Sequence, residues 1–234
     1  MVPLSFAGQE FALTRSGALY WAAKETLLVA DLHLEKGSFF ARRGQLIPPY
    51  DSRETLNRVA AAIRETGARR VVTLGDNFHD DEGSARLEPH ACGMLEALTN
   101  AVEWLWITGN HDAGMKAQCG GKLHEEIDLA GVALRHIARP GENGNEISGH
   151  FHPKLQVAVH HRRVRRACAV ISANDEVGDG QANRMIMPAF GAFTGGMDAA
   201  HPAILKALQP ASSIEAVLPA GHRLVRFPLW QKAA

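Results

Sequence analysis

Clusters of metal-binding side chains recur along this chain in a fixed relation to predicted β-strands, and this recurrence limits the possible folds more than any other feature. The clusters are Asp31-Leu32-His33, Gly75-Asp76-Asn77, Gly109-Asn110-His111-Asp112, the lone His136, and Gly149-His150-Phe151-His152. Each follows a stretch with strand character, and α/β folds place their functional groups at the carboxyl ends of strands. Imidazole, carboxylate and amide ligands that converge there would form a site for two divalent cations, an arrangement typical of phosphoester hydrolases.

The five clusters indicate a functional site only when taken together in their order, because each cluster alone is a weak signal. An Asp-x-His pair such as Asp31 and His33 occurs by chance in many proteins, although alternation along a strand end would point both side chains the same way. Gly75 would let the backbone turn sharply, so that the carboxylate of Asp76 can reach between two ions. A single pair could be a structural accident, whereas five clusters in this order favour a functional site.

The first half of the chain alternates strands with helices. Buried strands are predicted at Thr26–Ala30, Arg70–Leu74 and Val102–Thr108, and helices at Asp51–Thr66 and Leu87–Leu98. Trp104 and Trp106 lie on alternate positions of the third strand, where core packing suits them better than stacking on a nucleobase.

The second half is predicted to consist mainly of strands. They lie at Val132–Ile137, Leu155–His160, Arg165–Ser172, Arg184–Met187 and Leu224–Phe227, with one short helix at Ile204–Leu208. The segment Ala173–Ala182, rich in Asn, Asp and Gly, is predicted to be a mobile loop. We therefore expect an α/β fold in which two β-sheets lie face to face, flanked by helices, as a single domain over residues 1–234.

Composition excludes few classes of protein. Lys plus Arg equals Asp plus Glu at 25 each, so the net charge gives no electrostatic argument for binding to nucleic acid or to a membrane. The three cysteines are scattered and suit a reducing cytoplasm, where we expect the protein to reside. The sequence shows neither a signal peptide pattern nor an apolar run of membrane-spanning length, so we expect no membrane association.

The five clusters resemble the five signature blocks of the calcineurin-like metallophosphoesterases, whose fold is an α/β/β/α sandwich. Three longer segments are similar to the DNA-ligase-associated metallophosphoesterases of bacteria: Leu74–Asp80, Ile147–Pro153 and Met187–Gly196. That subfamily is encoded beside an ATP-dependent DNA ligase, a helicase and an exonuclease, and it acts as a phosphodiesterase and DNA endonuclease. The resemblance thus implies a DNA substrate, single-stranded or damaged, and a functional association with those enzymes.

The resemblance also implies a role for each polar residue of the clusters. One metal ion would be bound by Asp31, His33 and His152. The other would be bound by Asn110, His136 and His150, and Asp76 would bridge both ions. His111 would be the catalytic histidine, which contacts the scissile phosphate and assists the leaving group, and Asp112 would orient its imidazole.

Two departures from the superfamily pattern are visible. The second block of the superfamily often reads Gly-Asp-x-x-Asp-Arg, whereas here His79 stands in place of the second Asp and no Arg follows. That Arg helps to hold phosphate in the protein phosphatases, so its loss disfavours a phosphoprotein substrate. His136 is followed by Ile-Ala-Arg-Pro, where the family usually has Glu-Pro. The mixed nitrogen and oxygen ligands favour Mn²⁺, Fe²⁺ or Zn²⁺ over Mg²⁺, and the resemblance favours Mn²⁺.

Residues outside the metal ligands are candidates for substrate binding. Arg162, Arg163, Arg165 and Arg166 form a basic run that would either hold a DNA backbone or be a solvated hairpin. Strand alternation would place Arg162 and Arg166 on one face and Arg163 and Arg165 on the other. Arg42 and Arg43 follow the first cluster and would contact a phosphate or lie in a solvated loop. His79 is expected near the metals, in substrate contact or in a structural hydrogen bond.

Two classes of function fit this pattern. The first is a two-metal phosphodiesterase, a DNA endonuclease in repair, with a phosphodiesterase or phosphomonoesterase acting on small nucleotides as the alternative. The second is a binding scaffold, since members of this fold exist that have lost their metal ligands. The presence of every expected ligand and of His111 favours the enzyme.

Overall fold

The computed structural model describes residues 1–112, 114, 120–159, 162–174 and 182–232. Its first sheet has seven strands in sequence order. They are β1 (Val2–Phe6), β2 (Gln9–Leu13), β3 (Leu19–Trp21), β4 (Thr26–Val29), β5 (Arg70–Leu74), β6 (Glu103–Ile107) and β7 (Lys122–His124). Strands β1 to β4 pair antiparallel, and β4 to β7 pair parallel. The parallel strands therefore end at one common edge, where the first three clusters begin.

The second sheet also has seven strands, in the order β16-β15-β13-β14-β10-β9-β8. Their bounds are β8 (Glu126–Leu129), β9 (Val132–Arg135), β10 (Asn145–Ser148), β13 (Ala169–Ala173), β14 (Arg184–Ile186), β15 (Ser213–Ala220) and β16 (Arg223–Gln231). Strands β9, β10 and β14 are parallel to one another, so the last two clusters also follow strands that end together. The remaining strands, β11 (Lys154–Val159) and β12 (Arg162–Ala167), form a separate two-stranded hairpin.

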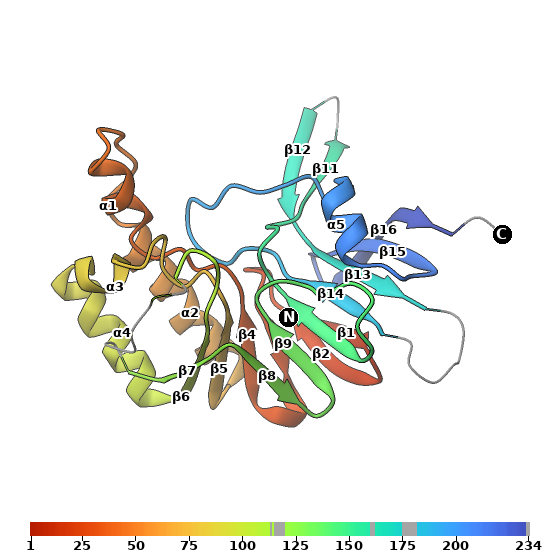
Figure 1. Ribbon diagram of the computed structural model, residues 1–234, viewed down its shortest axis with the longest axis horizontal. Helices are drawn as coiled ribbons and strands as arrows, with labels where there is room; N and C mark the ends of the chain where they lie inside the picture. The colour runs from red at the N-terminus through yellow and green to blue at the C-terminus, as the bar shows by residue number, and fades with distance from the viewer. Residues whose placement is uncertain (113, 115–119, 160–161, 175–181, 233–234) are drawn as a thin grey trace.

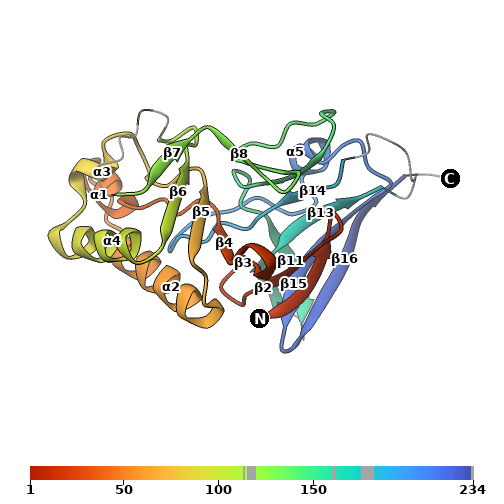
Figure 2. The ribbon, with the colours of Figure 1, turned by 90° about the horizontal axis from the view of Figure 1, so that it is seen from below.

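The helices lie outside the two sheets, as Figures 1 and 2 show. They are α1 (Lys36–Ala41), α2 (Asp51–Thr66), α3 (Gly83–Arg86), α4 (Pro89–Ala101) and α5 (Pro202–Ala207), with a 3-10 turn η1 at Ala22–Lys24. One apolar core fills the space between the sheets, with Leu28 and Val72 from the first sheet against Leu134 and Met185 from the second. A second core packs α2 and α4 on the first sheet, and a third packs α5 on the second. This layering confirms the predicted sandwich of two sheets flanked by helices.

The structure confirms some of the local predictions from the sequence and contradicts others. Trp104 and Trp106 are fully buried in the core under α4, as predicted. The predicted strand Arg165–Ser172 is wrong, because the chain breaks at Cys168 into β12 and β13, which belong to different sheets. The exposed arginines of β12 suit a hairpin in solvent, whereas the first four residues of β13 are buried between two neighbouring strands. Most of the predicted loop Ala173–Ala182, namely residues 175–181, lies outside the described residues.

Within the described part of the chain, no helix is long and apolar enough to cross a membrane.

Candidate metal centre

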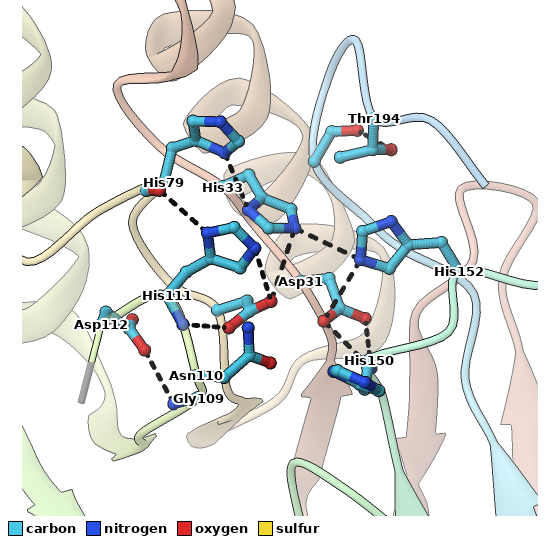
Figure 3. A network of polar contacts seen from close by, with 12 residues as sticks. Asp31, His33, His79, Gly109, Asn110, His111, Asp112, His150, His152 and Thr194 are labelled. Atoms are coloured by element: carbon cyan, nitrogen blue, oxygen red, sulfur yellow. Dashed lines mark hydrogen bonds and ion pairs between the residues drawn. The ribbon is translucent and has the colours of Figure 1, made fainter. Parts of the chain in front are cut away.

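The metal-binding clusters meet at the edge where the parallel strands of both sheets end. Asp31 follows β4 by two residues and Asp76 follows β5 by two. In the second sheet, His136 directly follows β9 and His150 follows β10 by two residues. Figure 3 shows the imidazoles and carboxylates from these loops turned toward one another. The site is therefore assembled from the two sheets of the sandwich, which explains why its residues are spread over more than a hundred positions.

An unusual backbone conformation brings these side chains together. Left-handed φ angles occur at Asp31 (53°), His33 (45°), Asp76 (48°), His150 (75°) and His152 (49°). Such angles are uncommon outside glycine and cost free energy. The expectation that Asp31 and His33 converge through strand alternation is therefore wrong: both lie beyond the end of β4, where the backbone turns at each of them. Hydrogen bonds hold these turns, with the N–H of His33 donating to the carbonyl oxygen of Asp76 at 2.9 Å.

Two glycines of the motifs are required by close packing rather than by flexibility alone. A Cβ atom on Gly75 would collide with the imidazole of His136, and one on Gly109 would collide with Asp76. Gly75 also has a positive φ of 79°, which glycine adopts without strain. Each glycine lets a neighbouring metal-binding side chain approach the backbone, so the Gly-Asp and Gly-Asn pairs are part of the site's geometry.

The first group of side chains consists of Asp31, His33, Asp76 and His152, whose ligand atoms all lie within 4.8 Å of one another. The Nε2 atoms of His33 and His152 are 3.2 Å apart. Nε2 of His33 is also 3.7 Å from Oδ2 of Asp76, and Nε2 of His152 is 3.5 Å from Oδ1 of Asp31. These are the residues that the resemblance assigns to one ion together with the bridging carboxylate.

The second group consists of Asp76, His136 and His150. Nε2 of His136 lies 3.2 Å from Nδ1 of His150, 3.3 Å from Oδ1 of Asp76 and 2.9 Å from Oδ1 of Asn110. Asp76 belongs to both groups through different oxygens, since Oδ2 faces His33 and Oδ1 faces His136. This is the arrangement that a carboxylate shared between two cations requires.

The protonation state of His136 tests whether these residues fit a cation. Its Nδ1 lies 2.9 Å from the carbonyl oxygen of Leu74, which can only accept, so Nδ1 carries the hydrogen. In the neutral imidazole, which is the form that binds metal, Nε2 then carries a lone pair that points at the oxygens of Asn110 and Asp76. Three electron pairs aimed at one point repel one another unless a cation lies between them. The donor set therefore fits divalent metal ions.

Burial favours the neutral, metal-binding form of two of the imidazoles, those of His33 and His150. Burial, followed by the neighbouring His152, His79 and His111, lowers the pKa of His33 to about 2. Burial and then His136 lower the pKa of His150 as well. Metal ions bind imidazole only in its unprotonated state, so these shifts prepare the site for cations at neutral pH.

His111 lies at the open side of the cluster, with its side chain 41% exposed. Its Nε2 is 3.9 Å from Oδ2 of Asp76, and its Nδ1 is 3.1 Å from the carbonyl oxygen of His79. The ring of His79 stacks on that of His111, with centroids 5.2 Å apart. Nδ1 of His79 also faces Nδ1 of His33 at 3.3 Å, so His79 lies beside the metal ligands as expected.

The expected role of Asp112 is contradicted by the structure. Its carboxylate is fully buried and accepts three backbone N–H groups, from Asn77 (2.6 Å), Phe78 (3.1 Å) and Gly109 (2.7 Å). Its oxygens are committed to the backbone, and the carbonyl of His79 orients the imidazole of His111 instead. Asp112 therefore joins the loops after β5 and β6, which carry Asp76 and Asn110.

Arg42 and Arg43 lie at the end of α1, away from the ligand groups. Arg42 forms an exposed ion pair with Glu82 at 2.8 Å, and the guanidinium of Arg43 covers the ring of Phe39 at 3.6 Å. Both line a cavity of about 590 Å³ together with Asp80 and neighbouring acidic residues. The ring of Phe39 in turn contacts His79 at a centroid distance of 4.5 Å. The acidic lining offsets the positive charge, which weakens the expectation of phosphate binding there.

The four arginines of β12 divide between the two faces of the hairpin. Arg163 and Arg165 pair with Ala158 and Gln156, on the face that also carries Lys154. Arg162 and Arg166 lie on the face of Leu155, which packs into the core beneath α5. Burial and the nearby Arg165 lower the pKa of Lys154. The register therefore confirms that the four arginines alternate between the two faces. Arg163 and Arg165 share their face with Lys154, and Arg162 and Arg166 do not.

Lys154 belongs to no metal-binding motif, so the sequence alone does not single it out. It follows His152 by two residues, and its Nζ donates to the carbonyl oxygen of Thr194 at 2.9 Å. Thr194 lies on the segment 188–196, and Figure 3 shows it on the side of the cluster that carries His33 and His152.

The sandwich and the two overlapping ligand groups at its strand ends define a metal-dependent phosphoesterase. A profile of the calcineurin-like phosphoesterases matches residues 25–161, and the chain belongs to this family. Members of the family use a dinuclear metal centre, and the two groups that share Asp76 are able to bind one.

Solved structures show similarity over most of the chain. Pseudomonas putida nuclease MPE is 26% identical, with a TM-score of 0.68, and the match covers 92% of this chain and 95% of that chain. Yfce, a phosphoesterase from E. coli, is 13% identical, with a TM-score of 0.43, and the match covers 87% of this chain and 98% of that chain. A search of curated proteins found no match.

Proposed function

We propose that this phosphoesterase hydrolyses phosphodiester bonds in DNA, as an endonuclease of DNA repair that acts on single-stranded or damaged strands. The observation that carries the proposal is the basic hairpin beside the metal centre. β11 begins two residues after His152, and the hairpin presents Lys154, Arg163 and Arg165 on one face. A strand that reaches the metals would pass these cations, which suits a polyanion better than a small phosphate ester. The likeness to the P. putida protein, described as a nuclease, supports the same substrate.

The two cations would be held by Asp31, His33 and His152 on one side and by Asn110, His136 and His150 on the other, with Asp76 shared. When bound, such a pair of cations polarises the phosphoryl group and supplies an acidified water as nucleophile. Mixed imidazole, carboxylate and amide ligands favour Mn²⁺, Fe²⁺ or Zn²⁺ over Mg²⁺, and the family resemblance favours Mn²⁺ among the three.

His111 is placed to serve the leaving group. Its Nδ1–H donates to the carbonyl of His79, which fixes the ring, and Nε2 faces the ligand groups, 3.9 Å from Oδ2 of Asp76. A proton on Nε2 would pass to the departing oxygen, because an alkoxide leaves a phosphodiester poorly without one. General acid catalysis of this kind contributes about 10²–10⁴-fold in rate.

The family resemblance supports a wider role. The subfamily that shares three segments of this sequence is encoded with a DNA ligase, a helicase and an exonuclease. We therefore propose a functional association with those three enzymes, in which this protein opens a strand that they process and reseal.

The proposal is tested by a gel assay of the purified protein with Mn²⁺ on single-stranded and duplex DNA. We expect cleavage within single strands, and no cleavage by the Asp76→Ala variant. A parallel assay on dinucleotides and mononucleotides tests the alternative, a phosphodiesterase or phosphomonoesterase of small nucleotides. Turnover of the small substrates with intact DNA would contradict the proposed endonuclease.

A further inference from the structure

A short segment crosses the mouth of the metal centre, and we call residues 191–197 the strap. It begins where the N–H of Gly191 donates to the carbonyl oxygen of Asp31 at 3.2 Å. It ends where the N–H of Met197 donates to the carbonyl oxygen of His152, also at 3.2 Å. Asp31 and His152 belong to the same ligand group, so the middle of the strap is anchored on both sides to that group.

Contacts along its length hold the strap in place. The N–H of Ala192 donates to the hydroxyl of Thr55 on α2 at 2.9 Å. On the other side, Lys154 donates to the carbonyl of Thr194 and Arg165 donates to that of Gly196, each at 2.9 Å. The strap is thus fixed between α2 and the basic face of the hairpin, so the side chains that it carries have defined positions.

Phe193 is the third residue of the strap, and its backbone conformation costs free energy. Its φ of 57° lies in the left-handed region, which a bulky aromatic residue rarely adopts, and its side chain is 46% exposed. Among the described residues, Phe193 and Tyr50 are the only aromatic members of the exposed large hydrophobic set. The two rings lie 5.8 Å apart, with an angle of 64° between their planes. Backbone strain that places a ring in solvent beside a metal centre points to a binding role.

We propose that Phe193 and Tyr50 form a stacking platform for an unpaired nucleobase of the strand bound at the metal centre. This inference rests on the proposed function and specifies its substrate further. Aromatic side chains stack on bases regardless of sequence, and a base held in duplex offers no free face to them. The platform lies on the α2 side of the strap, and the cations Lys154 and Arg165 lie on the hairpin side. Bases and phosphates of a single strand would therefore be held on opposite sides of the strap.

The test compares two oligonucleotides of equal length, one with its bases and one with an abasic sugar–phosphate chain. Phe193→Leu keeps an apolar side chain but removes the ring, and Phe193→Trp keeps a ring. We expect Phe193→Leu to lower kcat/KM for the base-bearing strand, relative to the abasic strand, by about tenfold, which corresponds to the lower part of the range for one stacked base. Phe193→Trp should retain the wild-type ratio. Leu46→Ala, at a 90% exposed position in the loop before α2, is the matched control and should also retain it.

The outcomes separate this inference from the proposed function. If the wild-type protein cleaves neither oligonucleotide, the proposed function fails. If it cleaves DNA but Phe193→Leu changes both strands equally, or neither, the platform is overturned. A thermal unfolding curve of each variant accompanies the assay, and Tyr50→Leu supplies a second variant if Phe193→Leu proves unstable. Selective loss on the base-bearing strand by either variant, with folding intact, supports the platform.

Discussion

At the residue scale, the candidate metal ligands are carried by a backbone that is under strain. Five of them have left-handed φ angles, each at a cost of roughly 1–3 kcal/mol. The sequence predicts which residues take part, because Asp, Asn and His in these clusters have the chemistry of ligands. It does not predict the left-handed turns, because Asp and His adopt this conformation more often than most residues but still at only a small minority of their positions. The assignment of Asp112 failed for a related reason, since adjacency in sequence does not show which backbone groups a buried carboxylate accepts.

The role of His111 is tested by its leaving-group dependence. We expect His111→Ala to slow hydrolysis of an alkyl phosphodiester by about 10²-fold or more, because the departing alkoxide then lacks a proton donor. A diester with a nitrophenolate leaving group should slow far less. Metal content, measured by elemental analysis, should match that of the wild-type protein. Equal slowing of both substrates would show that His111 acts in phosphate binding rather than proton donation.

The buried His33 should make the metal-free protein sensitive to acid. Its pKa is lowered to about 2 in the folded state, so below pH 6.5 the unfolded chain takes up a proton that the folded chain excludes. Stability is therefore complete above pH 6.5 and falls as the pH drops toward 2. Between pH 6.5 and pH 5 the loss from this residue is about 2 kcal/mol.

Urea unfolding in the presence of a chelator measures this effect. Between pH 7.5 and pH 5, the stability of His33→Asn should fall by about 2 kcal/mol less than that of the wild-type protein. The same substitution at His222, which is exposed on the turn between β15 and β16, serves as the control. Parallel pH profiles for wild type and His33→Asn would contradict the lowered pKa.

At the element scale, the strands that carry the ligands were predicted closely, whereas the hairpin was not. β5 matches the predicted strand residue for residue, because a run of buried β-branched and aliphatic residues is flanked by polar ones. The boundary at Cys168 was missed because arginines and the apolar residues after them both suit strands. The two elements differ in their pairing partners: β12 pairs with β11, whereas β13 pairs with β14 and β15. Strand pairing depends on the tertiary structure, so local sequence does not show it.

The two faces of the hairpin supply a matched comparison. Converting Arg163 and Arg165 to Ala should weaken single-stranded DNA binding and reduce its salt dependence, by roughly 0.7 in log–log slope for each lost phosphate contact. The double variant of Arg162 and Arg166 removes the same charge from the opposite face and should have a much smaller effect. Filter binding at several salt concentrations measures both. Equal losses would show that net charge, rather than the face toward the strap, determines binding.

At the scale of the whole molecule, the sandwich fold can be predicted from the order of strands and helices along the chain. The metal centre cannot, because it forms only where loops from both sheets meet. The clusters after β4, β5 and β6 are ordered by parallel pairing within one sheet, which the sequence implies. How His136 and His150 reach them depends on the packing of the second sheet across the core, which local patterns do not specify. The strap is likewise fixed by contacts to α2 and to the hairpin, so only its position in the sequence was predictable.

The central claim is that one carboxylate joins two metal ions in a single hydrolytic centre. It predicts that the wild-type protein, equilibrated with Mn²⁺ and dialysed, retains two ions per chain by elemental analysis. Asp76→Ala should retain at most one, because both ligand groups lose the residue that they share. Its hydrolysis of bis-p-nitrophenyl phosphate should fall below a tenth of the wild-type rate, a change that needs only ~1.4 kcal/mol at the transition state. A wild-type protein that binds a single ion, or an Asp76→Ala variant that keeps two ions and full activity, would contradict the account.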